Sequence, residues 1–151
     1  EDSINAARAA IAEGVVPGGG LALLYAAGAL DALVSRTEGH VQQGAKLLQK
    51  ALSQPLHQIA ANCGLDGQAA VRRALDSRPG VGLDARRGRQ VDLAASGIID
   101  PVKVSYSAVR HAASVAGLIL TTQTLIAKKP DVIDPTAGPA LRGGAERLGR
   151  A

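Results

Sequence analysis

Aromatic side chains are almost absent from this chain of 151 residues. It contains no Phe and no Trp, and Tyr25 and Tyr106 account for the whole aromatic share of 1%. A core without aromatic rings must be filled by Ala, Leu, Ile and Val, which suits closely packed helices. The length is enough for one domain that buries roughly two thirds of its unfolded surface. The sequence therefore predicts a single, mainly α domain.

The charge pattern bears on possible partners. Charged residues make up 20% of the chain, and the net charge is +4. That share is low for a helical monomer, so part of the apolar surface is expected to meet a partner. A basic chain raises the question of nucleic-acid binding, but the Lys and Arg residues stand in small groups without aromatic residues between them to stack on bases. We interpret them as solvated faces and expect no nucleic-acid partner.

The cellular compartment is indicated by the single cysteine and by the apolar runs. Cys63 has no second cysteine for a disulfide, which fits a reducing, cytoplasmic environment. The longest apolar run, around residues 112–120, is too short for a membrane span and is interrupted by Ser and Gly, so no membrane contact is expected. The chain contains no Met and begins directly in a helical pattern, which is typical of a piece of a longer protein.

Hydrophobic periodicity predicts five helices in the first half of the chain. Gly14 and Gly64 are expected to end the first and the fourth of them. Pro55 is expected to start or kink the fourth. The predicted ranges are 1–13, 21–34, 40–52, 55–63 and 66–75.

The second half is more varied. The glycines and short β-like pieces of SRPGVGLDARRGRQV, residues 77–91, predict a small β-hairpin. A brief helix is expected over 92–96. In GIIDPVKV, Asp100 is interpreted as the N-cap and Pro101 as the first residue of a helix that runs to about Leu120. The β-branched residues of TTQTLIAKKP predict one strand, and the remaining tail is expected to be flexible.

A proline and three glycines, Pro17-Gly18-Gly19-Gly20, stand directly before a predicted helix. Free main-chain N–H groups at a helix N-terminus attract anions, and missing side chains let a phosphate or a sugar approach the main chain. The alternative is a tight corner between helices that needs a positive φ or close main-chain packing. The local pattern favours the corner.

Two carboxylates also allow two interpretations. Asp100 is explained by capping alone, yet a carboxylate at a loop–helix junction can also accept hydrogen bonds from a ribose. Asp2 lies on the first predicted helix, where most such residues are solvated and only a nearby phosphate or metal would make one catalytic. The three histidines and Cys63 have no metal-ligand spacing, so no metal site is predicted from these residues.

Four motifs in this order resemble one family. They are EDSINAARAAIAEGVVPGGGLAL, PLHQIAANCG, SGIIDPVKV and SAVRHAASVAGLILTT. Over residues 1–130 the chain resembles the C-terminal half of the equatorial, ATP-binding domain of group I chaperonins of the GroEL type. The resemblance implies a helical bundle with a small β-hairpin and one C-terminal strand, followed by a flexible basic tail over 131–151.

The resemblance also implies an ATP site with magnesium. In the family, the aspartate of the opening motif positions the water that attacks the γ-phosphate, and this motif places Asp2 here as the catalytic residue. The family's glycine motif lies against the nucleotide, which points to Gly19 and Gly18.

Two further segments are implied to contact the nucleoside. The family's G-Y/L-N/D-A segment touches the adenine side and reads GLDA here, which gives Asp84 and Ala85, with Arg86 next. The aspartate of G-I-x-D-P holds the ribose in the family and corresponds to Asp100.

The chain departs from the family in its tail, which is basic and without Met, whereas the family's tail is rich in Gly and Met. The family's phosphate loop, most of its magnesium carboxylates and its apical domain are N-terminal to the matching part. ATP, magnesium, a GroES-type co-chaperonin and unfolded clients are therefore expected to need that part, as are ring contacts with other chaperonin subunits.

Two hypotheses of function follow. The first is the C-terminal half of a chaperonin ATPase domain, which would be inactive alone. The second is a truncated, non-catalytic paralogue that acts as a helical assembly or interaction module. Retention of Asp2, Gly19 and Asp100 together favours the first.

Overall fold

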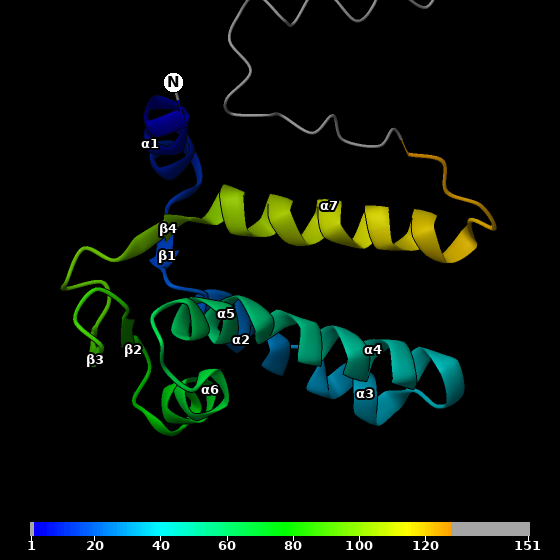
Figure 1. Ribbon diagram of the computed structural model, residues 1–151, viewed down its shortest axis with the longest axis horizontal. Helices are drawn as coiled ribbons and strands as arrows, with labels where there is room; N and C mark the ends of the chain where they lie inside the picture. The colour runs from blue at the N-terminus through cyan, green and yellow to red at the C-terminus, as the bar shows by residue number, and fades with distance from the viewer. Residues whose placement is uncertain (1, 128–151) are drawn as a thin grey trace, which may run out of the picture. The chain divides into compact units, whose positions relative to one another are not determined.

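A computed structural model describes residues 2–127, with side chains from Ser3 onward. The chain divides into two units, residues 1–116 and 117–151, and the boundary falls inside the last helix. The predicted mainly α fold is confirmed (Figure 1). The tail over 131–151 lies outside the described residues.

Seven helices and four short strands make up the described chain. The helices are α1 Asp2–Glu13, α2 Leu21–Gly28, α3 Asp31–Arg36, α4 Gly39–Leu52, α5 Gln54–Asn62, α6 Gly67–Asp76 and α7 Val102–Thr121. The strands are β1 Val15–Pro17, β2 Val81–Asp84, β3 Arg89–Asp92 and β4 Ile99–Pro101. Within these residues, no helix has the length and apolar character that crossing a membrane requires.

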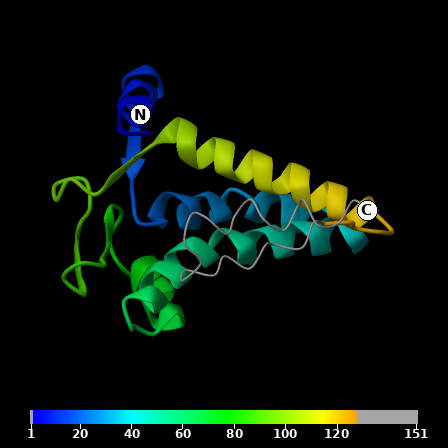
Figure 2. The same cartoon turned by 45° about the horizontal axis from the view of Figure 1, so that its top comes forward.

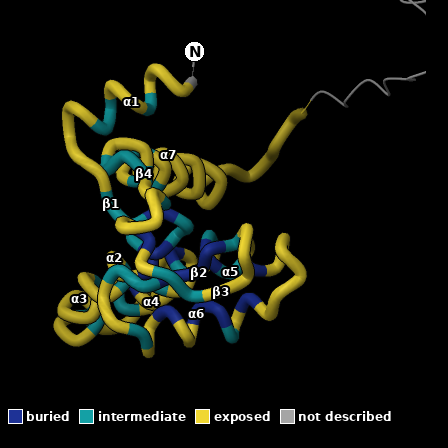
Figure 3. The backbone as a smooth tube through the Cα atoms, turned by 90° about the vertical axis from the view of Figure 1, so that its left-hand side faces the viewer, coloured by how far each residue is buried: buried dark blue, intermediate teal, exposed yellow. Residues whose placement is uncertain are grey.

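The buried core lies where α2, α5 and α6 meet the hairpin of β2 and β3. Small side chains such as Ala60 and Ala74 let α5 and α6 approach closely, and both helices carry dark blue segments in Figure 3. The core residues are Leu21, Leu24, Leu56, Ala60, Ala70, Val71, Ala74, Leu83 and Leu93. Leu, Ala and Val alone fill it, as the lack of aromatic residues requires.

The predicted helix over 21–34 is interrupted between α2 and α3. The main-chain N–H groups of Ala29 and Leu30 donate to carbonyls three residues back, at 3.1 Å each, instead of four. The Gln49 side chain of α4 donates to the Ala27 carbonyl at 3.3 Å and to an Asp31 carboxylate oxygen at 2.7 Å. Contacts with α4 therefore accompany the break between α2 and α3, which the hydrophobic pattern of residues 21–34 does not predict.

The β2–β3 hairpin is confirmed, but the brief helix expected over 92–96 is wrong. Asp92 pairs with Val81 at the end of β3, and the chain then turns. The N–H of the buried Leu93 donates to the Gly80 carbonyl at 3.0 Å. Residues 93–97 form a turn rather than a helix, closed by the N–H of Ile98, which donates back to the Leu93 carbonyl at 2.8 Å.

A second antiparallel pair, β1 with β4, was not predicted. Val16 lies opposite Asp100, and Pro17 lies opposite Ile99. Figure 2 shows the blue strand β1 beside the yellow-green segment that leads into α7. The interpretation of Asp100 as an N-cap and Pro101 as the first helical residue is therefore wrong, because both lie in β4 with extended backbone. Helix α7 begins at Val102, whose N–H donates to the Gly14 carbonyl at 3.1 Å.

The C-terminal strand expected over 121–130 is not formed in its described part. Thr121 ends α7, and residues 122–127 contain no strand. A strand needs a neighbour for its main-chain hydrogen bonds, and no strand of the described chain pairs with this segment, since β1 pairs with β4 and β2 with β3. Residues 128–130 lie outside the described part.

Candidate nucleotide-binding site

Gly20 is explained by packing between two helices. It precedes α2 with φ of 80°, in the left-handed region that favours glycine. A Cβ at this position would lie 2.7 Å from the main-chain nitrogen of Leu56 in α5. Main chain cannot yield as the end of a flexible side chain can, so no side chain fits. The tight-corner interpretation therefore holds for Gly20.

Gly18 and Gly19 have different surroundings. A Cβ at the buried Gly18 would lie 3.3 Å from the carboxylate atoms of Asp100. At Gly19, with φ of 63°, the nearest atom would be the Leu83 carbonyl oxygen at 3.7 Å, an ordinary contact. Gly18 also donates its N–H to the Ile98 carbonyl at 3.0 Å. These two glycines thus bring bare main chain beside a carboxylate and beside the end of the hairpin.

Asp100 lies half-buried in β4, held in register by its pairing with Val16. Among the described residues, no hydrogen bond or ion pair engages its carboxylate. Both oxygens can therefore accept hydrogen bonds from a bound hydroxyl group. Because this carboxylate lies against Gly18, a ligand that reaches it also meets main chain without side chains.

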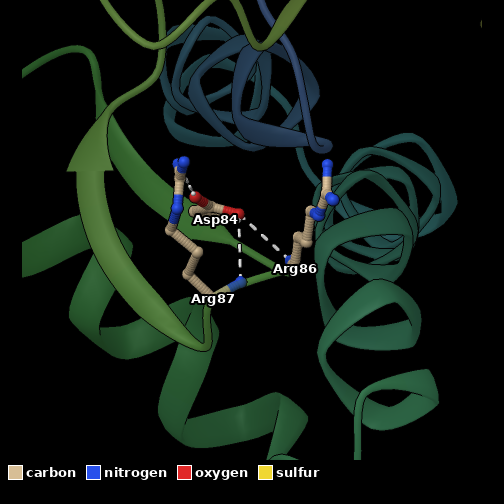
Figure 4. Close-up of polar contacts among 3 residues, drawn as sticks. All are labelled: Asp84, Arg86 and Arg87. Atoms are coloured by element: carbon tan, nitrogen blue, oxygen red, sulfur yellow. Dashed lines mark hydrogen bonds and ion pairs between the residues drawn. The ribbon is translucent and has the colours of Figure 1, made fainter.

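Asp84 ends β2 and is 3% exposed, and it is the one polar residue of the described chain in the buried core. One carboxylate oxygen accepts from the N–H groups of Arg86 and Arg87 at 3.0 and 3.2 Å. The other accepts from the Arg87 guanidinium at 2.9 Å (Figure 4). Burial raises the pKa of this carboxyl, but these hydrogen bonds and the Arg87 charge outweigh it, so the pKa lies below its ordinary value.

The structure thus brings together most of the segments expected at the site. Gly18 meets Asp100, and Gly19 meets Leu83, the residue before Asp84. Ala85, which is half-buried, and the exposed Arg86 follow in the turn of the hairpin. Asp2 begins α1, but its side chain lies outside the described residues.

Sequence reasoning missed the β1–β4 pair and the two carbonyls that adjoin the glycines, those of Ile98 and Leu83. The paired β-branched residues Val15-Val16 and Ile98-Ile99 were the available signal for two short strands. Nothing in the local sequence indicates which carbonyl faces a glycine.

The polar groups of these segments bear on which part of a ligand they can hold. The half-buried Asp100 carboxylate has the chemistry to accept from a sugar hydroxyl, and the half-buried main chain of Gly19 has no side chain to block an adjacent phosphate. Among the described residues, no three His, Cys, Asp or Glu side chains lie close enough to share a metal ion.

Comparison with known proteins decides the family. The model of the TCP-1/cpn60 chaperonin family matches residues 1–130. The chain belongs to this family. It is 50% identical over all 151 residues to Chaperonin GroEL 4 of Bradyrhizobium diazoefficiens, and it spans 28% of that protein's length. The resemblance to group I chaperonins is therefore confirmed.

Two solved chaperonin structures share the fold. A group III chaperonin in the open state matches with a TM-score of 0.70 and 32% identity, over 78% of this chain and 25% of that one. An open-state monomer of a group II chaperonin from Methanococcoides burtonii matches with a TM-score of 0.66 and 24% identity, over 72% of this chain and 28% of that one. In each case this chaperonin chain corresponds to a minor part of a larger protein.

Proposed function

We propose that this chain forms one wall of the ATP site of a cytoplasmic chaperonin subunit. The subunit would assemble into a ring and assist the folding of other proteins through ATP binding and hydrolysis. The observation that carries the proposal is the Asp100 carboxylate, without a partner among the described residues and lying against the bare main chain of Gly18. Membership of the chaperonin family supports it.

Each segment would have its own role. Asp100 would accept hydrogen bonds from the ribose hydroxyls, and the main chain of Gly18 and Gly19 would lie against the sugar and phosphates. The turn from Asp84 to Arg86 would face the adenine. Bound Mg-ATP supplies the phosphoryl group and the cation that neutralises its charge. Asp2 would orient the attacking water.

Energetics indicate that these residues do not suffice alone. Micromolar binding requires about 8 kcal/mol. A helix N-terminus contributes roughly 0.3–1 kcal/mol, and a hydrogen bond to a charged group about 1.5–3 kcal/mol. The carboxylate of Asp100 also repels a polyphosphate that carries no cation. We therefore expect no ATP binding at micromolar concentration when residues 1–151 are titrated by calorimetry, and saturable binding would contradict this half-site argument.

The proposal is tested in a full-length subunit that contains this chain. Asp100→Asn keeps the shape of the side chain but removes its charge, so ATP affinity should fall by about tenfold or more. The matched control is Asp76→Asn, at the exposed end of α6, which should bind as the unmodified subunit does. Fluorescent-nucleotide titration measures both. Equal affinity of Asp100→Asn and the unmodified subunit would remove Asp100 from the site.

The role of Asp2 needs a separate test. In the same subunit, Asp2→Ala should keep nucleotide binding and lose turnover on the order of 100-fold, because the water is no longer held in line. Single-turnover phosphate release measures the loss. Turnover at the unmodified rate would show that another group orients the water.

The second candidate, an assembly or interaction module without catalysis, is favoured by helix α7. None of its residues is buried, and it exposes large apolar side chains, among them Val104, Val115, Leu118 and Ile119. Other chaperonin subunits are the proposed partners of that surface, whereas a GroES-type co-chaperonin and unfolded clients would bind other domains. Mixing this chain with complete subunits distinguishes the two, since a module would enter or disrupt their rings without an effect of Asp100→Asn.

A further inference from the structure

The Asp84 carboxylate is occupied by the chain itself. Three N–H groups donate to its two oxygens, from the main chain of Arg86 and from the main chain and guanidinium of Arg87. Its main-chain carbonyl accepts two further hydrogen bonds, from the same Arg87 main-chain N–H at 3.2 Å and from the Gly88 N–H at 2.8 Å. Four donor groups therefore make five hydrogen bonds to one residue at the end of β2, because the main-chain N–H of Arg87 is shared between the carboxylate and the carbonyl.

Because the Asp84 carboxylate is buried, replacing its hydrogen-bond donors by a ligand would be unfavourable. The side chain of Asp84 is 5% exposed, while that of Arg87 is 59% exposed. A ligand that took the carboxylate would have to displace donors from a buried acceptor, and a buried group without its hydrogen bonds is destabilising. A role in which the carboxylate keeps these partners avoids that loss.

The place of Asp84 in the hairpin shows which neighbouring residues its hydrogen bonds hold in position. The preceding residue, Leu83, places its carbonyl beside Gly19, and the following residues, Ala85 and Arg86, form the turn. The hydrogen bonds that close the turn over Asp84 therefore determine where Ala85 and Arg86 stand relative to Gly19. Figure 4 shows the Arg87 guanidinium at one carboxylate oxygen and the main-chain N–H groups of Arg86 and Arg87 at the other.

We propose that Asp84 is a positioning residue that acts with Arg87: the pair holds the turn over 84–88 in the shape that presents Ala85 and Arg86 to the nucleotide. The Asp84 carboxylate does not itself bind the base. This inference rests on the proposed ATP site and refines the role of one residue within it.

The test compares ATP with ITP, in which an oxygen replaces the 6-amino group of adenine, in the full-length subunit. Arg87→Met removes the guanidinium, and Asp84→Asn removes the charge it pairs with. Each variant should weaken ATP and ITP binding by the same factor, on the order of tenfold, since a displaced turn affects both ligands. The double variant should be no weaker than either single variant, because both act through one contact. Arg87→Lys should recover part of the affinity, since an ammonium group can still donate to the carboxylate.

The control is Arg89→Met. Arg89 is exposed on the same hairpin and has no ion pair among the described residues, so its replacement should leave both affinities unchanged. The inference is overturned if Arg87→Met binds ATP normally, or if Asp84→Asn alters the ratio of ATP to ITP affinity, as loss of a direct contact to the 6-amino group would. An unmodified subunit that binds no ATP would instead refute the proposed function, and this inference with it.

Discussion

Helix α6 is short and has a buried face, whereas helix α7 is twice as long and has none. Helix α6 has ten residues, and Gly67, Ala70, Val71 and Ala74 are all buried. Helix α7 has twenty residues and none is buried. Because helical stability in proteins comes mainly from packing of an apolar face, the shorter helix is the one that the described chain itself stabilises.

The same contrast separates the proposed site from the apolar surface. Gly18, Gly19 and the Asp84 turn lie on or beside the packed elements α2, α5 and β2. The large apolar residues of α7 remain exposed within the described residues. The site residues are thus held by a core that this chain provides, whereas no core of the described residues covers the apolar side chains of α7.

The largest expected effect tests burial directly. Leu56→Ala removes a side chain that is 1% exposed in α5 and should lower the free energy of unfolding by about 2–5 kcal/mol. Leu118→Ala makes the same chemical change on α7, where Leu118 is 67% exposed, and should change it by less than about 0.5 kcal/mol. Urea unfolding followed by circular dichroism measures both. Comparable losses would show that α7 is covered in solution and would break the comparison.

The next prediction concerns the tight corner between α2 and α5, which requires glycine at Gly20. Gly20→Ala should destabilise by about 1–2 kcal/mol for the left-handed conformation alone, and more because its Cβ would meet Leu56 main chain. Gly44→Ala is the matched control. Gly44 lies inside α4 with open space around it, so alanine there should stabilise by about 0.5–1 kcal/mol. Changes of the same sign at both positions would contradict the packing argument.

A third prediction concerns the cap of α6. The Asp66 carboxylate accepts from the N–H groups of Gln68 and Ala69 at 2.8 and 3.1 Å. The hydrogen bond from Ala69 lowers the pKa of Asp66 most, burial opposes it, and the hydrogen bond from Gln68 and the charges of Arg72 and His57 lower it further.

Since the folded pKa lies below the ordinary value of 3.8, the stabilisation is complete above that pH and is lost as the pH falls through the folded pKa. Asp66→Asn should keep the cap at neutral pH, because Asn caps about as well as Asp, and should reduce the loss of stability in acid. Urea unfolding at pH 7 and at pH 3 measures this. An unchanged acid dependence would show that Asp66 is not the group that titrates.

The smallest effect concerns the exposed pair between α1 and α7. Lys103 and Glu13 lie 3.6 Å apart, with side chains 57% and 42% exposed. Lys103→Gln should lower the free energy of unfolding by about 0–1 kcal/mol, and added salt should remove the difference. Thermal unfolding at low and high salt checks this. A larger, salt-resistant loss would mean that this end of α7 is more protected than its exposure indicates.

Much of the local structure could be predicted from the sequence, since periodicity and helix-ending glycines act within a few residues. The ends of α1, α4 and α6 agree with the predicted ranges within a residue or two. The hairpin was predicted from its glycines for the same reason. The break after Gly28 was not, because the Gln49 side chain that accompanies it comes from another helix.

For the site, the sequence named the segments but not the roles of their atoms. Asp100 has the residue type and following proline of an N-cap, yet pairing with Val16 extends its backbone and leaves its carboxylate against Gly18. Asp84 matches a motif, yet Arg87 and two main-chain N–H groups occupy its carboxylate.

The amino-acid sequence by itself determined the helical class, the hairpin and the family, because composition, periodicity and motif order are properties of the chain alone. Only the tertiary structure decided that Gly20 serves packing while Gly18 faces a carboxylate, and that Asp84 is buried while Asp100 keeps open oxygens. The physical reason is that such roles depend on which main-chain and side-chain atoms meet across segments far apart in the chain, and no local pattern encodes those distances.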